Sequence, residues 1–150
     1  MAGTITDAHA TLKARAGNIN SIDAAHRFWQ DEDNVLPNAE TFAFFEITTD
    51  LGGFIEFGGG SGANRERVTG ELHVYVFSPR PTNLETMLPL AEEIATVYRS
   101  YRPGNVVFCN EATVLPIGEG TSLAPASIAS AVSDYKCVLV VVSLYFDQIG

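Results

Sequence analysis

The chain has 150 residues, 46% of them hydrophobic and 18% charged, and its formal net charge is −9. This composition supplies enough apolar material for one domain, expected to span residues 1–150, and too little charge for a disordered chain. The negative charge argues against a dedicated nucleic-acid binder, and without an apolar run of about 18 residues or a secretory signal pattern we expect no membrane partner.

The first predicted element is an amphipathic helix over residues 4–16. Its apolar positions, three or four residues apart on one stripe, are Ile5, Ala8, Leu12 and Ala16. Thr4 or Thr6 caps the start of this helix, and Gly17 ends it. Residues 24–29 follow a turn and are expected to form a short strand.

An acidic run over residues 31–34 comes next. Clustered carboxylates are typical of a metal loop, but this run lacks the glycine and the distal glutamate of a calcium loop. We therefore interpret it as a solvated turn. The three histidines, His9, His26 and His73, lie far apart in the sequence and have no second ligand type at metal spacing. We expect neither a metal nor a cofactor.

Two long strands joined by a glycine-rich segment are predicted in the middle of the chain. The first covers residues 42–57, with a break at Gly52-Gly53, and the second covers residues 68–77. Both are rich in aromatic and β-branched side chains, which suit a half-buried sheet. The segment between them, Gly58–Arg67, has no apolar side chain larger than Ala, so we expect a mobile arm on a rigid hairpin.

This arm is the candidate partner-binding site. Its candidate residues are Gly58, Gly59, Gly60, Ser61, Gly62, Ala63, Asn64, Arg65 and Arg67. Two interpretations of Arg65 and Arg67 stay open: pairing with carboxylates of a neighbouring subunit, or ordinary solvated charge. The arm lacks the final glycine of a nucleophile elbow, and it has neither the Lys-Ser/Thr pair nor the following helix of a phosphate loop. We therefore predict no catalytic residues and no enzyme activity.

The clearest predicted helix begins near Thr86 and is stopped by the sequence at residues 102–104. The preceding segment, residues 78–81, contains two prolines and is not expected to continue a central strand. A start near Thr86 places Pro89 in the first helical turn, where its missing N–H does no harm. The apolar stripe of this helix is Met87, Leu88, Ala91, Ile94, Ala95, Tyr98 and Tyr101.

The last part of the chain is predicted to be mostly strand. Two short strands are expected at residues 106–109 and 113–117, and residues 118–133 form either a long surface loop or a loop with one short helical turn. Residues 135–147 form a long strand whose unbroken apolar run indicates a central position, covered on both faces or by a partner subunit. Cys109 and Cys137 are expected to be buried free thiols.

The order of elements predicts an α+β fold, with one mixed, mostly antiparallel sheet and two main helices packed on it. Several segments, taken in order, resemble the tail terminator (minor tail) proteins of long-tailed bacteriophages and the tail-terminator-like family of prophages. These segments are the N-terminal helix with its Leu12–Arg15 turn, the Leu36–Asn38 approach to Phe44–Ile47, the Arg65–Val68 lead into Gly70–Val76, the helix between Pro79 and Tyr101, and the final Tyr135–Phe146 strand. Residues 118–133, which are rich in Gly, Ala and Ser, depart from the pattern.

The resemblance implies a structural virion protein at the neck end of the tail, assembled in the host cytoplasm. Such a protein forms a homohexameric ring that caps the tail tube, stops its polymerisation and joins the tail to the head-completion (neck) proteins. Its partners are then copies of itself, the tail tube protein and a neck protein, while DNA passes the lumen without specific binding. The free chain is either a monomer or a ring. The alternatives are another phage neck or tail-tube subunit, or an α+β ligand-binding domain or enzyme.

Overall fold

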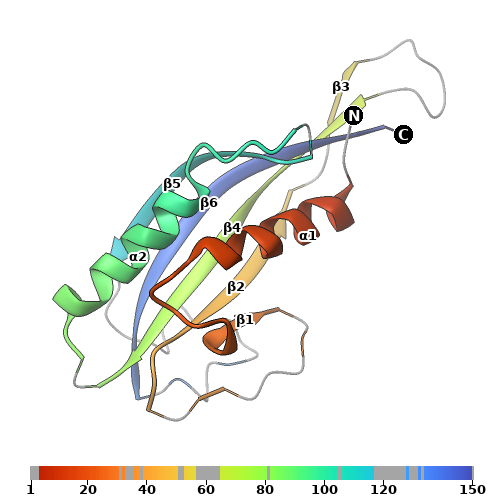
Figure 1. The fold of residues 1–150 in the computed structure, drawn as a ribbon. Coiled ribbons are helices and arrows are strands. Elements are labelled where there is room, and N and C mark those ends of the chain that lie inside the picture. The colour runs from red at the N-terminus through yellow and green to blue at the C-terminus, as the bar shows by residue number, and fades with distance from the viewer. Residues whose placement is uncertain are drawn as a thin grey trace.

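A computed structural model describes residues 4–30, 32, 36–37, 39–50, 53–56, 65–80, 82–104, 106–116, 128, 132 and 134–149, with the backbone alone for residues 53–56, 65 and 149. Two α-helices cross one face of a six-stranded sheet (Figure 1). The elements are α1 (Ile5–Arg15), the 3₁₀ turns η1 (Ala16–Asn18) and η2 (Ala24–His26), β1 (Arg27–Trp29), β2 (Phe42–Thr49), β3 (Gly53–Glu56), β4 (Arg65–Pro79), α2 (Leu84–Tyr98), β5 (Phe108–Pro116) and β6 (Tyr135–Ile149). The predicted α+β class is confirmed.

The sheet is built around its two longest strands, β4 and β6, each of 15 residues. They pair antiparallel over their whole length, from Arg65 opposite Ile149 to Pro79 opposite Tyr135. The strand order is β1-β2-β4-β6-β5, and β3 pairs with β4 beyond the end of β2. Only β1 and β2 run parallel, so the sheet is mixed and mostly antiparallel, as predicted.

The first helix begins at a complete capping box. The Thr4 hydroxyl accepts a hydrogen bond from the Asp7 N–H, and the Asp7 carboxylate accepts one from the Thr4 N–H. Two backbone donors of the first turn are satisfied in this way, which fixes the start of the helix. Leu12 and Ala8 then face the core, and the Tyr98 hydroxyl of α2 donates a 2.7 Å hydrogen bond to the Leu12 carbonyl.

The second helix begins earlier than predicted. Its N-cap is Asn83, whose side-chain oxygen accepts a hydrogen bond from the Thr86 N–H at 3.1 Å, so Thr86 lies inside the helix. Pro89 is consequently an internal residue of α2 and not a first-turn one. A proline there removes one intrahelical hydrogen bond, but the apolar face is buried against the sheet and tertiary packing outweighs local propensity.

Other predicted boundaries are also corrected. Residues 24–26 form a 3₁₀ turn, and only Arg27–Trp29 are a strand. The predicted strand at 42–57 is two strands, β2 and β3, both paired with β4. The two short strands expected at 106–117 are one strand, β5, interrupted by a bulge between Cys109 and Ala112. Pro79 still belongs to β4, where it is the last residue of the strand.

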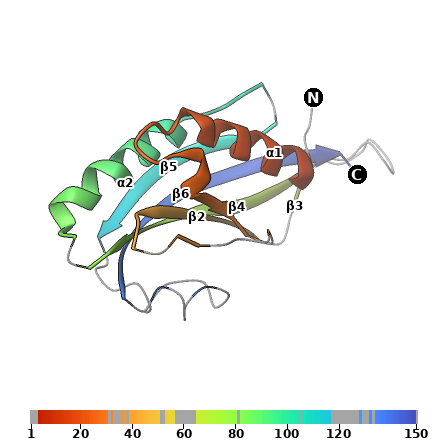
Figure 2. The same ribbon diagram turned by 60° about the horizontal axis from the view of Figure 1, so that its bottom comes forward.

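Both faces of the sheet carry buried apolar side chains. The larger core lies between the sheet and the helices (Figure 2), where Val74 and Val140 of the central strands pack with Leu12 and Ile94. A second cluster covers part of the opposite face. It consists of Phe42, Phe44, Tyr75, Phe77, Ile128, Val132, Tyr135, Cys137 and Leu139. The prediction that β6 is central, with apolar residues on both faces, is therefore confirmed over its first half.

Candidate functional site

The predicted arm falls mostly outside the described part of the chain. Gly58, Gly59, Gly60, Ser61, Gly62, Ala63 and Asn64 lie outside the described residues. The arm is shorter than predicted, because β4 begins at Arg65 and both arginines belong to the strand. The backbone of Arg65 pairs with Glu56 on one side and with Ile149 on the other.

Arg67 has a partner within its own chain. Its guanidinium forms a two-point ion pair with Asp147 of β6, with Nε to Oδ1 at 2.8 Å and Nη2 to Oδ2 at 3.0 Å. The hydrogen bond to Asp147 raises the pKa of Arg67 above its ordinary value, against the opposing effect of desolvation. The Arg67 guanidinium also lies 4.1 Å from the ring centre of Tyr145, which stacks on Phe108 of β5. Arg67 therefore bridges strands inside the subunit.

The face of the sheet opposite the helices carries a shallow groove where the second cluster ends. It has a volume of about 310 Å³ and is lined by Glu71, Glu111, Thr113, Leu115, Val141 and Ser143. We call this the acidic groove. Its floor is partly apolar and accessible, since Leu115 is 42% exposed and Val141 is half-buried. The register places Glu71 opposite Ser143 and Thr113 opposite Val141, so three adjacent strands build the groove.

The charge of this groove is negative. Glu71 and Glu111, two of its lining residues, are exposed carboxylates. His73, next to Glu71 on the same face of β4, places its Nε2 3.2 Å from the Glu71 carboxylate. Among the described side chains that β4, β5 and β6 present on this face, Arg67 is the one Lys or Arg, and its charge is matched by Asp147.

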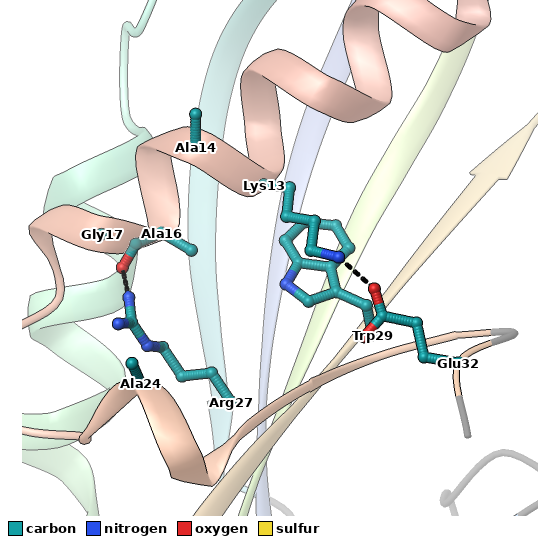
Figure 3. A pocket seen from close by; sticks show the side chains of 8 residues that line it. All are labelled: Lys13, Ala14, Ala16, Gly17, Ala24, Arg27, Trp29 and Glu32. Atoms are coloured by element: carbon teal, nitrogen blue, oxygen red, sulfur yellow. Dashed lines mark hydrogen bonds and ion pairs between the residues drawn. The ribbon is translucent and has the colours of Figure 1, made fainter. Parts of the chain in front are cut away.

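A second hollow lies on the helix side, between the end of α1 and the start of β1 (Figure 3). It has a volume of about 230 Å³, and its lining residues are Lys13, Ala14, Ala16, Gly17, Ala24, Arg27, Trp29 and Glu32. Lys13 forms an ion pair with Glu32, and Nη1 of Arg27 donates a hydrogen bond to the Ala16 carbonyl. The Nε of Arg27 is buried and has no hydrogen-bond partner among the described residues.

Residues of the types that bind metals or act as nucleophiles, the histidines and cysteines, have structural surroundings. His9 packs edge-on against Trp29, and His26 pairs with Glu40 at 2.8 Å. In the part of the chain that the structure describes, no group of three His, Cys, Asp or Glu side chains could hold a metal ion. Cys109 and Cys137 are buried free thiols, as predicted, and burial raises the pKa of each to about 12. Both thiols are therefore protonated and unreactive at neutral pH.

Sequence reasoning missed the acidic groove, although the sequence contains a signal for it. In β4 the polar residues Thr69, Glu71 and His73 alternate with apolar neighbours, which is the period-two pattern of a strand with one solvated face. What the sequence does not give is the cross-strand register that brings Glu71 close to Thr113 and Leu115. That register depends on the bulge in β5.

The described helices include none long and apolar enough to cross a membrane. Comparison with known proteins supports the fold alone. No protein-family model and no curated protein matches the sequence. Among the solved structures that match, one whose name describes no function has a TM-score of 0.59 at 14% sequence identity, covering 98% of this chain and 97% of the other. The chain thus shares its fold with that structure over nearly the full length of both.

Proposed function

We propose that this protein is a structural subunit of the tail-terminator type, which forms a ring on the end of a phage tail tube, stops tube growth and connects the tail to the neck. The observation that carries the proposal is the acidic groove, a part of the sheet surface that the described residues leave accessible. Leu115 and the half-buried Val141 give that surface an apolar part beside its two carboxylates. The resemblance in the order of elements indicates which partners would make the contact: copies of the chain, the tail tube protein and a neck protein.

The rigidity of the sheet supports the same proposal. The groove is formed by β4, β6 and β5, and β4 and β6 are hydrogen-bonded along their entire length. The backbone of such strands is ordered without a partner, so little backbone entropy is lost on binding. A ring subunit that repeats the same contact needs that kind of surface.

A ligand-binding domain is the second candidate, and the helix-side hollow is the observation that favours it. Its buried Arg27 Nε has no partner among the described residues and is suited to an anion. However, the volume of about 230 Å³ is below the usual range of about 300–1,000 Å³ for small-molecule sites. The Arg27 guanidinium is also bonded to a backbone carbonyl. We therefore favour the assembly function.

The test is complementation of a phage that lacks the protein, scored by tail length in electron micrographs and by infectious particles. We expect overlong or uncapped tails without the protein and normal tails when it is restored. Glu92→Gln, a change at an exposed position of α2, serves as the matched control and should restore normal tails. Tails of normal length in the absence of the protein would contradict the proposal. Stabilisation of the purified chain by inorganic phosphate, abolished by Arg27→Gln, would favour the ligand-binding alternative.

A further inference from the structure

Basic side chains are concentrated around the C-terminal ends of the two helices. Of the nine Lys and Arg residues in the chain, five lie there. They are Lys13, Arg15, Arg27, Arg99 and Arg102, and we call this group the basic end. Direct contacts hold the group together: Arg15 of α1 donates to the Val97 carbonyl of α2 at 2.9 Å and lies 4.3 Å from the ring centre of Tyr101.

The arginines of the basic end are bound to neutral oxygens. Arg15 and Arg27 donate to backbone carbonyls at the ends of α2 and α1, which is a favourable place for a cation. Arg99 donates to the Ala112 carbonyl at 2.8 Å, and Arg102 donates to the Asn110 side-chain oxygen at 3.0 Å. None of these four has a carboxylate partner within the described residues.

The hydrogen bonds of these arginines to their own chain stabilise the fold, but they leave other guanidinium N–H donors unused. Each guanidinium has five N–H donors, and Arg99 and Arg102 are exposed. An exposed arginine held in place by one hydrogen bond to its own chain is preorganised for a two-point contact with a carboxylate. In a chain with a net charge of −9, this is a local positive surface.

The molecule thus has two complementary surfaces. Lys13 and Arg15 belong to α1 on the helix side of the sheet (Figure 2), and Arg99 and Arg102 are hydrogen-bonded to Ala112 and Asn110 of β5. Glu111 lies between those two residues in the sequence and lines the acidic groove, so the two surfaces adjoin at β5. The groove presents the exposed side chains of Glu71, Glu111 and Leu115. Two different, complementary patches on one chain favour head-to-tail contacts, which close into a ring if the rotation between copies permits.

We infer that the basic end of one copy docks into the acidic groove of the next, with Arg99 and Arg102 facing Glu71 and Glu111. This inference rests on the proposed function for the premise that copies of the chain associate. The occupant of the groove is therefore a second copy of this chain. The joint combines ion pairs with apolar contact at Leu115, so it weakens but does not vanish as salt is added.

The experiment compares charge-reversed variants of the full chain by sedimentation and native mass spectrometry. One variant carries Glu71→Lys with Glu111→Lys, and the other carries Arg99→Glu with Arg102→Glu. The control, Glu85→Lys with Glu92→Lys, changes the charge as much as the first variant does, at exposed positions of α2 outside both surfaces. Thermal unfolding establishes that every variant is folded.

We expect the wild-type chain and the control to form species larger than a dimer at about 10 mM salt, where the Debye length is about 30 Å. Each reversed variant alone should need at least a tenfold higher concentration to assemble. An equimolar mixture of the two reversed variants should assemble again when the variants alternate. The reversed basic end of one variant then meets the reversed groove of the other, and the two unchanged surfaces meet at the next joint.

Three results would overturn the inference: a wild-type chain that stays monomeric at low salt, a reversed variant that assembles as the wild type does, or a mixture that fails to assemble. The tail-length assay keeps this test separate from that of the proposed function. Normal tail capping by both reversed variants would reject this joint and leave the terminator role in place. Salt-sensitive assembly without any effect on tail length would reject the terminator role and leave the joint.

Discussion

Gly70 lies where β2 ends beside β4, and the backbones approach closely there. It pairs with Thr49, and a Cβ atom built on Gly70 would lie 2.2 Å from the Thr48 carbonyl oxygen. That oxygen belongs to a hydrogen-bonded strand and cannot rotate away as a side chain can. An isolated glycine in a strand pattern signals such a close approach, but the sequence does not say which backbone approaches.

We predict that Gly70→Ala destabilises the protein by about 1–3 kcal/mol, because the added methyl group forces β2 and β4 apart. Gly17→Ala is the matched control, since a Cβ at Gly17 meets nothing within 4 Å. This control should stabilise the fold by about 0.4–1 kcal/mol by restricting the unfolded chain. Urea unfolding of the two variants measures both effects. Equal stabilities would mean that β2 does not pass Gly70 as closely as described.

At the scale of elements, periodicity in the sequence predicts which face of a helix is buried. It does not predict the boundaries of helices and strands that depend on tertiary contacts. The predicted stripe of α2 is confirmed from Met87 to Tyr98, because its spacing of three and four fixes one face of a helix. Tyr101, the last residue of the predicted stripe, lies beyond the end of the helix at Tyr98. The predicted start near Thr86 is wrong, because it assumes that Pro89 must lie in the first turn, whereas the cap at Asn83 makes Pro89 an internal residue of α2. The sequence predicts two strands where the structure has the single strand β5, since a bulge interrupts the alternation of polar and apolar residues as a strand end does.

One contact of α2 binds the turn that follows α1. Oε1 of Glu93 accepts hydrogen bonds from the Asn20 N–H at 2.7 Å, the Ser21 N–H at 3.0 Å and the Ser21 hydroxyl at 3.0 Å. Burial alone would raise the pKa of Glu93, but these three hydrogen bonds outweigh it, so the pKa is lowered. The ionised carboxylate therefore stabilises the folded state.

We predict that Glu93→Gln destabilises the protein by about 1 kcal/mol at neutral pH, since hydrogen bonds to a charged acceptor are stronger than those to an amide. The lowered pKa gives the sign of the pH dependence: the stabilisation is present above pH of about 4.3, the ordinary pKa of Glu, and is lost as the pH falls through the lower folded pKa. The control Glu92→Gln, one residue away and exposed, should change little at any pH. Unfolding curves at pH 7 and pH 3 measure this difference, and a Glu93→Gln effect of equal size at both values would contradict it.

At the scale of the whole molecule, the sheet separates two cores of unequal size. The residues of the helix-side core are predicted well from the sequence, because the spacing of apolar residues in an amphipathic helix indicates its buried face. The second cluster gathers side chains from segments far apart in the chain, among them Phe42, Tyr75, Ile128 and Leu139. Periodicity carries no information on such long-range contacts. The acidic groove begins where this cluster ends, so periodicity does not predict the position of the groove either.

A substitution at Leu139 tests how much the second cluster contributes to the free energy of unfolding. Its side chain is 7% exposed and faces away from the helices, opposite Tyr75 across the β4–β6 ladder. We predict that Leu139→Asp destabilises the protein by about 3–4 kcal/mol, because it places an unpaired carboxylate among apolar groups and removes their packing. Val141→Asp, at a half-buried position nearer the groove, should cost less. Thr113→Asp, exposed on the neighbouring strand, should cost at most about 1 kcal/mol from strand propensity. Thermal and urea unfolding give the order of the three. If Leu139→Asp cost no more than Thr113→Asp, the opposite face would be solvated along its whole length, and the acidic groove would have no apolar cluster to bound it.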